Sequence, residues 1–244
     1  MSTDKTRIKQ IELGDIYVDI IFKDIKNVHL SVNPPKGRVR ISAPLRMDMD
    51  LIRNFAITKI HWINKQRIKF NKQKRETPRE YVTRESHYFF GKRYLLKVIE
   101  QAAPPKIVLK HSTIELYIRD KNDIRQKQTA LQEWYRQQLK IIAQKYILEF
   151  GKKIGVTLNG FGVKKMKTRW GTCNQNSKMI LINLDLAKKP AECIEYVVIH
   201  ELIHLTERKH NENFIRLLTK FCPKWRKIKE ELNDLALSYE KWDY

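Results

Sequence analysis

Short apolar runs with alternating polar residues fill most of the first 120 residues, and this pattern predicts β-strands. IYVDIIF (16–22) predicts one strand, and HLSV and RVRIS flank NPPKG, whose Pro and Gly suit a hairpin loop. The later runs YFF, YLLKVI, KIVL and IELYI are separated by Gly91, Pro104–Pro105 and His111–Ser112. They predict a β-meander, so we expect an antiparallel, β-rich region here.

One helix is expected inside this region. Apolar residues recur at three- and four-residue steps between positions 51 and 63, and Asp48 can cap the helix at its N-terminus. The polar, basic segment KQRIKFNKQKRETPRE that follows predicts a linker. The period then becomes helical again, because apolar positions between Leu131 and Phe150 mark one face of a long helix that Gly151 or Gly155 could end.

A β-hairpin and three more helices are predicted after that long helix. VKKMKTRWGTC, NQNSK and MILINLDLA form the hairpin, and Pro190 suits the first turn of the next helix. Residues 211–221 and 223–237 are expected to form two closing helices. The order of elements predicts an α+β fold, divided into a β-rich region with one helix, 1–120, and a region with a long helix, a β-hairpin and further helices, 121–244.

The charge balance is strongly basic. Lys and Arg number 49 against 27 Asp and Glu in 244 residues, which gives a net charge of +22. Such an excess suits either the binding of a polyanion, such as nucleic acid, or a basic surface that keeps the protein soluble. The densest basic cluster belongs to the first helix and its tail, beside Trp62 and Phe70, and comprises Lys65, Arg67, Lys69, Lys72, Lys74 and Arg75.

Cysteine usage and the absence of long apolar runs indicate the compartment. Cys173, Cys193 and Cys222 cannot all pair and none forms a C-x-x-C, so reduced thiols are expected. The start, MSTDKTRIKQIELGD, has no apolar core of a signal peptide, and no run reaches the roughly 18 apolar residues of a membrane span. We expect a soluble, cytoplasmic protein without a membrane partner, and its oligomeric state is left open.

The most specific chemistry lies in VVIHELIHLTERKH, which contains H-E-x-x-H. At about 100° per residue, His200 and His204 lie about 40° apart on one helical face, so both imidazoles can share one metal ion. Glu201 lies on the same side and can hold a water molecule bound to that metal. The alternative is a buried helix that merely carries histidines. A divalent cation would, however, compensate for two imidazoles and a carboxylate among apolar neighbours.

A catalytic zinc needs a third protein ligand, and His210 is the leading candidate. In an unbroken helix His210 would lie about 9 Å beyond His204 along the axis, out of reach of the ion. The helix must therefore break between Leu205 and Lys209, although the intervening TERK has no Gly or Pro to force a break. The rival ligands are Glu207, Glu212, Glu230 and Glu231, with Cys173 a more remote candidate.

Three neutral imidazoles would leave zinc its full charge, which lowers the pKa of a bound water toward about 7. Glu201 could take that proton, steer the hydroxide onto a carbonyl and pass the proton to a leaving amine. We therefore expect a zinc-dependent hydrolase with one ion per chain, which cleaves peptides or proteins. Two alternatives stay open: hydrolysis of nucleotide phosphates, and a nucleic-acid-associated basic protein such as a protease recruited to DNA.

Several motifs, in order, resemble the YgjP-like metallopeptidases, a zincin family related to the SprT-like proteases. They are RWGTC, MILINLDL, the Pro-started helix with YVVIHELIHL, and KHNENF, together with HWI and EWYR in the earlier helices. The resemblance extends over about residues 15–238, so one continuous family domain is also possible. It implies a zincin-like catalytic region at 121–244 with His210 as the third zinc ligand and Glu201 as the catalytic acid. Glu207 stands where metzincins have Gly, which counts against the metzincin label.

The resemblance also implies a substrate cleft. In zincins a strand before the motif helix commonly pairs with an extended peptide, and MILINLDL would offer a free edge unless it lies inside the sheet. Trp170 and Gly171 are candidates for the cleft wall, although Trp170 could belong to the core. Asn183 is a further cleft candidate, and Arg169, Asn183 and Tyr196 are candidates for stabilising the oxyanion.

Overall fold

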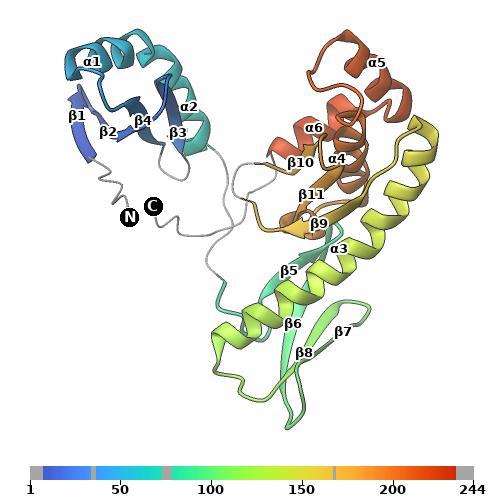
Figure 1. Ribbon diagram of the computed structural model, residues 1–244. Coiled ribbons are helices and arrows are strands. Elements are labelled where there is room, and N and C mark those ends of the chain that lie inside the picture. Colours follow the sequence, from blue (N-terminus) through green and yellow to red (C-terminus); the bar gives the residue numbers. More distant parts are fainter. Residues whose placement is uncertain (1–7, 34–36, 73–78, 167–168, 235–244) are drawn as a thin grey trace, which may run out of the picture. The chain divides into compact units, whose positions relative to one another are not determined.

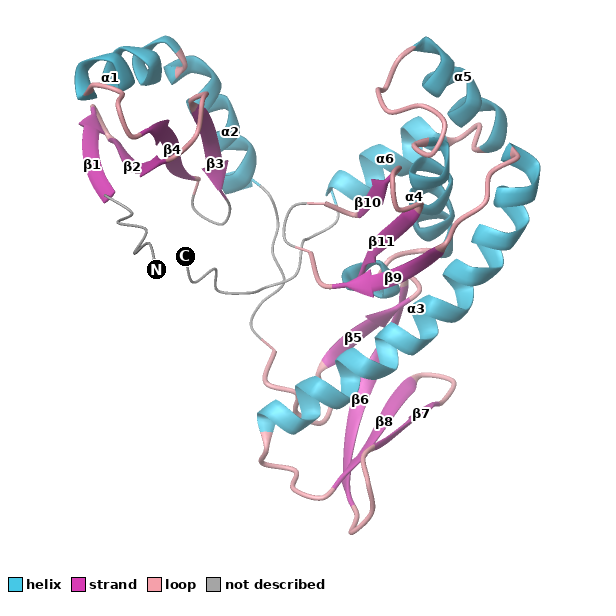
Figure 2. Cartoon of the chain, in the orientation of Figure 1, coloured by secondary structure: helices cyan, strands magenta, loops and turns pink. Residues whose placement is uncertain are grey.

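The computed structural model describes residues 8–33, 37–72, 79–166 and 169–234. These residues form two compact units, unit 1 within residues 8–72 and unit 2 within residues 79–234 (Figure 1). Each unit combines strands and helices, as Figure 2 shows, and the predicted α+β class is confirmed. None of the helices in these ranges is both long enough and apolar enough to cross a membrane.

Unit 1 is a four-stranded sheet with two helices. Its elements are β1 (Ile8–Leu13), β2 (Ile16–Lys23), β3 (His29–Asn33), β4 (Arg38–Pro44), α1 (Met49–Thr58) and α2 (Ile60–Lys72). The strand order is β1-β2-β4-β3, with β2 and β4 parallel and the other neighbours antiparallel. Ile20 and Ile41, which pair across β2 and β4, pack in one core with Ile52, Ala56 and Ile63 of the helices.

The helix predicted over residues 51–63 is two helices, which meet at Lys59. Asp48 caps the first helix as predicted, because its side chain accepts a hydrogen bond from the Met49 amide. At Lys59 the backbone leaves the helical region (φ −102°, ψ 4°), yet Ala56 and Ile63 on either side are fully buried. The apolar period therefore continues through the junction, which is why the sequence pattern does not reveal it.

Unit 2 begins with a second four-stranded sheet. Its strands are β5 (Ser86–Phe89), β6 (Lys92–Glu100), β7 (Lys106–Leu109) and β8 (Thr113–Ile118). The order β5-β6-β8-β7, with β6 and β8 parallel, repeats the topology of unit 1. The predicted meander is thus wrong. The antiparallel pairing expected for the N-terminal region holds except in the central pairs β2–β4 and β6–β8, because alternation locates strands without specifying their neighbours.

A long helix, α3 (Ile124–Ile154), connects this sheet to the second half of unit 2. The Asp123 side chain caps its start by accepting from the Gln126 amide, and Gly155 ends it in the left-handed region at φ +81°. α3 packs against β7 and β8 as well as β9 and the later helix α4 (Figure 2). The helix predicted from the apolar positions 131–150 is confirmed, with Gly155 as its end.

The remaining elements form a three-stranded sheet and its helices. They are β9 (Gly160–Lys164), β10 (Gly171–Asn174), β11 (Met179–Asn183), the short 3-10 helix η1 (Leu184–Lys188), α4 (Ala191–Ile203), α5 (Glu212–Phe221) and α6 (Trp225–Asp234). The strand order is β10-β11-β9, so the strand within MILINLDL is interior, and its predicted free edge is wrong. Among the described strands, β10 is an edge of this sheet.

The compact units divide the chain at a different place from the boundary predicted at residue 120. Phe89, Leu96 and Ile114 of the β5–β8 sheet share one core with Leu139 of α3 and Ile199 of α4. These strands therefore belong with the C-terminal elements, since α3 packs both against their sheet and against α4. The alternative prediction, one continuous family domain, stays a prediction.

Candidate metal centre

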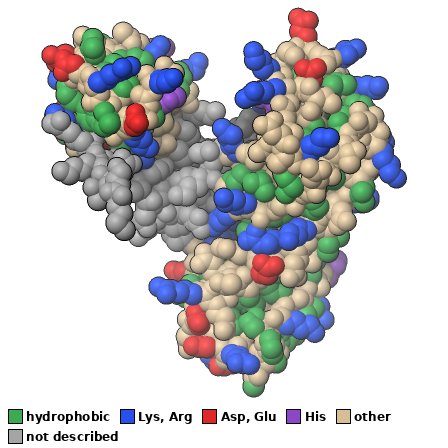
Figure 3. All heavy atoms as spheres, viewed as in Figure 1, with side chains coloured by type: hydrophobic (Ala, Val, Ile, Leu, Met, Phe, Trp, Pro, Cys, Tyr) green, Lys and Arg blue, Asp and Glu red, His purple; other side chains and the backbone are tan. Residues whose placement is uncertain are grey.

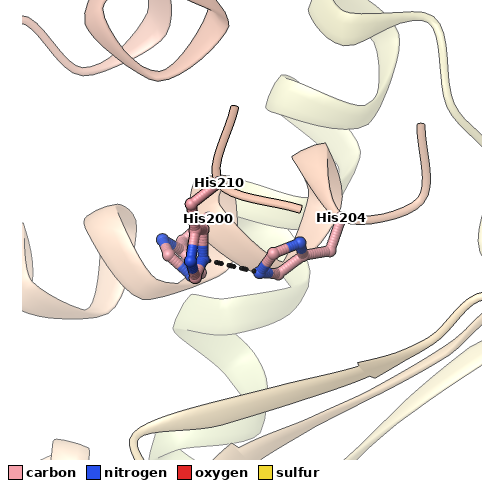
Figure 4. A group of neighbouring side chains, drawn as sticks. All are labelled: His200, His204 and His210. Carbon is pink, nitrogen blue, oxygen red and sulfur yellow. Dashed lines mark hydrogen bonds between the residues drawn. The ribbon is translucent and has the colours of Figure 1, made fainter. Parts of the chain in front are cut away.

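α4 is apolar on nearly every side, which fixes its rotation in the core of unit 2. Val198, Ile199, Leu202 and Ile203 have no exposed surface. The two histidines at its end, His200 and His204, are only partly buried and present their rings on one side of the helix (Figure 4). The burial of the apolar neighbours therefore sets the direction in which both imidazoles point.

The chain leaves the helix directly after His204. The amides of Leu205 and Thr206 bond to carbonyls three residues earlier, α4 ends at Ile203, and α5 begins only at Glu212. Asn211 caps α5, because its side chain accepts a hydrogen bond of 2.8 Å from the Phe214 amide. The break that His210 needs in order to reach the other histidines is thus present.

The bend brings three ring nitrogens together. Nε2 of His210 lies 3.1 Å from Nε2 of His200 and 3.1 Å from Nε2 of His204, and Figure 4 shows the three rings converging. These residues form a group that could hold a metal ion. Three imidazole nitrogens of this kind are a zinc-type donor set that leaves room for a further ligand.

The protonation states of the rings suit a metal. Burial lowers the pKa of His200 to about 3, and the neighbouring His204 and His210 act in the same direction. Burial also lowers the pKa of His210, so both rings favour the neutral form that can donate a lone pair. His204 Nδ1 lies 2.9 Å from the Glu207 carbonyl oxygen. A proton on Nδ1 leaves Nε2 of the same ring free to bind a metal ion where the three rings converge.

Glu207 holds the bend and takes no part in the histidine group. Its carboxylate accepts hydrogen bonds from the side-chain amides of Asn211, at 3.0 Å, and Asn213. These bonds lower the pKa of Glu207 below its usual value. The other rival ligands, Glu212 on α5 and Glu230 and Glu231 on α6, are also absent from the metal-ligand group found among the described residues, as is Cys173.

Glu201 lies beside this group at the end of the cleft wall formed by α4. Only 5% of it is exposed, and burial raises its pKa to about 8, with the positive charge of Arg169 opposing the rise. A buried carboxyl in this range can exchange a proton near neutral pH. The structure thus places a buried carboxyl group next to three converging imidazoles.

The group opens into a cleft of about 740 Å³. One wall is β10 with the residues before and after it, and the other walls come from α4, the bend and α6. The lining residues are Arg169, Trp170, Gly171, Thr172, Cys173, Asn174, Gln175, Asn176, Tyr196, Val197, His200, Glu201, His204, Arg208, His210, Lys229 and Leu232. Trp170 and Gly171, the candidates for the cleft wall, are in this lining, and so are Arg169 and Tyr196, the candidates for stabilising the oxyanion. Their roles toward a substrate stay predictions.

Asn183 does not line the cleft, contrary to the sequence-based expectation. It is 1% exposed, and its amide donates to the carbonyls of Met166 and Arg169, both at 2.8 Å. Its Oδ1 accepts from the amides of Met166 and Asp185. All of its hydrogen-bonding capacity is thus used on Met166, Arg169 and the start of η1, and none is left for an oxyanion.

Three contributors to the site were not predicted from the sequence. Gln175, after β10, donates a hydrogen bond to the carbonyl of His204 and so caps the C-terminal end of α4. Arg208 and Lys229 add positive charge to the lining. Arg208 lies inside the motif segment and could have been noticed there, whereas Lys229 comes from α6 and had no sequence signal.

The basic side chains do not gather at one place as the three histidines do. Lys and Arg side chains are spread over the visible face of each unit (Figure 3). In the predicted basic cluster, Lys65 and Arg67 lie on α2, and Arg67 forms an ion pair with Asp15 at 3.2 Å. Lys74 and Arg75 lie outside the described residues, as do the side chains of Lys69, Phe70 and Lys72.

Comparison with known proteins gives one extensive match. A family model described as YgjP-like, metallopeptidase domain, matches residues 26–235. No curated protein matches the chain. Among solved structures, the metallopeptidase zymogen abylysin of Pyrococcus abyssi is 17% identical over 38% of this chain and 90% of its own, with a TM-score of 0.34. The zymogen jannalysin of Methanocaldococcus jannaschii is 22% identical over 38% and 96%, with a TM-score of 0.31.

Proposed function

Because the chain belongs to the YgjP-like metallopeptidase family, we propose that it is a zinc-dependent peptidase whose metal is held by His200, His204 and His210. The observation that carries the proposal is the convergence of the three Nε2 atoms beside Glu201. Family membership supports a metal-dependent peptidase, and the donor set supports zinc. Three neutral imidazoles and an open side match the catalytic sites in which zinc is usual.

When bound, zinc would polarise the scissile carbonyl and make a water molecule more acidic. The part of the chain itself is proton transfer by Glu201. Its carboxylate would take a proton from the attacking water, whose oxygen forms a bond to the carbonyl carbon, and deliver that proton to the nitrogen of the departing amine. Its burial beside the cleft suits both steps, because burial raises the pKa of the carboxyl from its usual acidic range toward neutral pH and so makes it a stronger base.

β10 supports the binding of an extended substrate. All four residues of this strand, Gly171–Asn174, line the cleft, and among the described strands it has only β11 as a neighbour. A peptide could therefore pair with its outer edge by β-augmentation, and would then pass in front of the histidines. This role replaces the one predicted for the interior strand β11.

The test is the variant Glu201→Gln, which removes the proton-accepting carboxylate while keeping the shape of the side chain. We expect casein and peptide cleavage to fall by about 10²–10⁴-fold. Zinc content, measured by mass spectrometry, should stay at the wild-type level in Glu201→Gln and be lost in His204→Ala. Glu192→Gln, on the first turn of the same helix, is the matched control and should cleave normally.

The same variants separate the alternative functions. A Glu201→Gln protein that cleaves peptides as fast as the wild type would refute the role of Glu201. Turnover of nucleotide phosphates that disappears with Glu201→Gln, in the absence of peptide cleavage, would favour the nucleotide alternative. Salt-dependent DNA binding that is unchanged in Glu201→Gln would support a separate nucleic-acid role.

A further inference from the structure

Three cations surround the histidine group from three separate segments. Arg169 comes from the loop before β10, Arg208 from the bend between α4 and α5, and Lys229 from α6. All three are exposed and line the cleft. All three therefore bring positive charge to the walls of the cleft that holds the histidine group.

These charges are not neutralised by the acidic residues around them. Within the described parts of the chain, no ion pair joins a carboxylate to Arg169, Arg208 or Lys229. Glu207, the nearest acid in sequence to Arg208, is bound by Asn211 and Asn213. Glu201 is the one acidic residue of the lining, and its side chain is almost completely buried.

We propose that the cleft selects peptides with acidic side chains on the residues that flank the scissile bond, an inference that rests on the proposed peptidase function. Cations on the walls of a concave site focus a positive potential into it, which attracts anionic chains and repels basic ones. The three cations lie on different walls, so carboxylates on both sides of the scissile bond can be contacted. Peptides are the favoured occupant because β10 offers backbone pairing to an extended chain.

The inference can be tested by binding, separately from cleavage. The probes are three fluorescent peptides with blocked ends and one shared apolar sequence, which carry Glu, Gln or Lys on both sides of the centre. Affinities are measured with zinc-loaded Glu201→Gln protein and cleavage with the wild type. We expect the Glu peptide to bind about tenfold more tightly than the Gln peptide and the Lys peptide to bind most weakly, with the differences shrinking as salt is raised.

Charge-reversal variants assign the preference to the three cations. In the Glu201→Gln background, Arg169→Glu, Arg208→Glu and Lys229→Glu should each reduce the preference for the Glu peptide, and the triple variant should bind the Lys peptide best. Lys227→Glu is the control for Lys229→Glu, and Lys209→Glu is the control for Arg208→Glu. Both change the net charge equally but are exposed residues outside the lining, so the preference should persist.

Each outcome decides one of the two proposals. Equal affinity for the three peptides, or a preference that the reversals leave intact, overturns the acidic selectivity even if the wild type cleaves all three. A preference for the Glu peptide without any cleavage supports the selectivity and contradicts the peptidase function. A single-stranded DNA oligonucleotide is tested in the same assay. If it displaces the Glu peptide by binding more tightly, and the triple variant loses this binding, the cations are assigned to nucleic acid and the proposal is overturned.

Discussion

The carboxylate of Glu201 lies directly against the backbone of Gly171 on β10. A Cβ atom at position 171 would lie 2.6 Å from Oε1 of Glu201 and 2.7 Å from its Cγ, closer than non-bonded atoms approach. Glycine was expected here to allow a close backbone approach, and the group that approaches is the side chain of Glu201. Any larger residue must displace the carboxylate of Glu201, the proposed proton-transfer group, from its place beside the histidines.

Gly171→Ala is therefore expected to lower the peptidase activity by about 10²-fold, the cost of a misplacement of about 1 Å at a reacting group. Zinc content should not change, because the substitution alters none of the three histidines. Gly162→Ala in β9 is the matched control, since a Cβ there meets the flexible end of Leu181 at 3.0 Å. Equal activity of the two variants, measured as kcat/KM, would show that Gly171 does not position Glu201.

Asn183 contributes to the stability of the cleft wall. It makes four hydrogen bonds to backbone atoms while it is 1% exposed. In Asn183→Ala the carbonyls of Met166 and Arg169 would lose their partner, and we expect the free energy of unfolding to fall by about 3 kcal/mol. This loss of stability is measured by the hydrogen exchange of peptides from β9–β11 in increasing urea. Asn159→Ala, which removes one exposed bond to the Ser177 carbonyl, should cost less than about 1 kcal/mol.

The convergence of the three histidines could be predicted from the sequence, because helix geometry limits the alternatives. Two histidines four residues apart must share a face, and a third one six residues later can reach them only through a bend. Lys229 could not be predicted, because nothing in its own sequence neighbourhood indicates that α6 reaches the cleft. The role of Asn183 also escaped prediction, since an amide on a strand gives no sign of whether it faces a cleft or a loop.

At the level of elements, the bend between α4 and α5 contains neither Gly nor Pro, and hydrogen bonds of Glu207 hold it. Its carbonyl faces Nδ1 of His204, and its carboxylate binds the side chains of Asn211 and Asn213. One residue therefore orients one proposed ligand and fixes the segment that carries another. This arrangement explains how the chain turns at the position where metzincins have Gly.

Glu207→Ala is expected to weaken zinc affinity by about 10–100-fold, the usual effect of removing a group that supports a metal ligand. Competition with a chelating dye measures the affinity. Glu207→Gln keeps an oxygen that can accept from one of the asparagines, so it should lose less. Glu212→Ala, on the first turn of α5, should leave the affinity unchanged. A Glu207→Ala protein with wild-type affinity would show that the bend forms without this side chain.

Most strands could be located from the sequence, although β1 and β9 were missed, and the sheets could not be predicted, for one physical reason. Alternation reports which side of a strand is buried, so β2, β6, β8 and β11 could be located. Strand order depends on which edges meet in space, so the parallel pairs β2–β4 and β6–β8 and the interior place of β11 left no trace in the pattern. The residues 184–186 continued the alternation of β11 but form the 3-10 helix η1.

Across the whole molecule, the two four-stranded sheets have one topology but separate cores. The strand order and the directions of pairing are the same in β1–β4 and β5–β8. The core of unit 1 is built from residues between Leu13 and Ile63, and the core of unit 2 from residues between Phe89 and Leu232. The proposed metal site belongs entirely to unit 2, so a ligand bound there stabilises that unit directly.

Removal of zinc should therefore act on one unit only. A ligand present at about 1,000 times its Kd stabilises the structure that binds it by about 4 kcal/mol, and chelation removes this contribution. We expect amide hydrogen exchange after chelation to rise most in residues 200–214, where three imidazoles lose their shared cation, and more moderately in the rest of α4 and in β10. Exchange in β2 and β4 should not change, because the buried core residues of these strands belong to the core of unit 1 and not to that of unit 2. Faster exchange in β2 and β4 after chelation would show that the two cores are coupled.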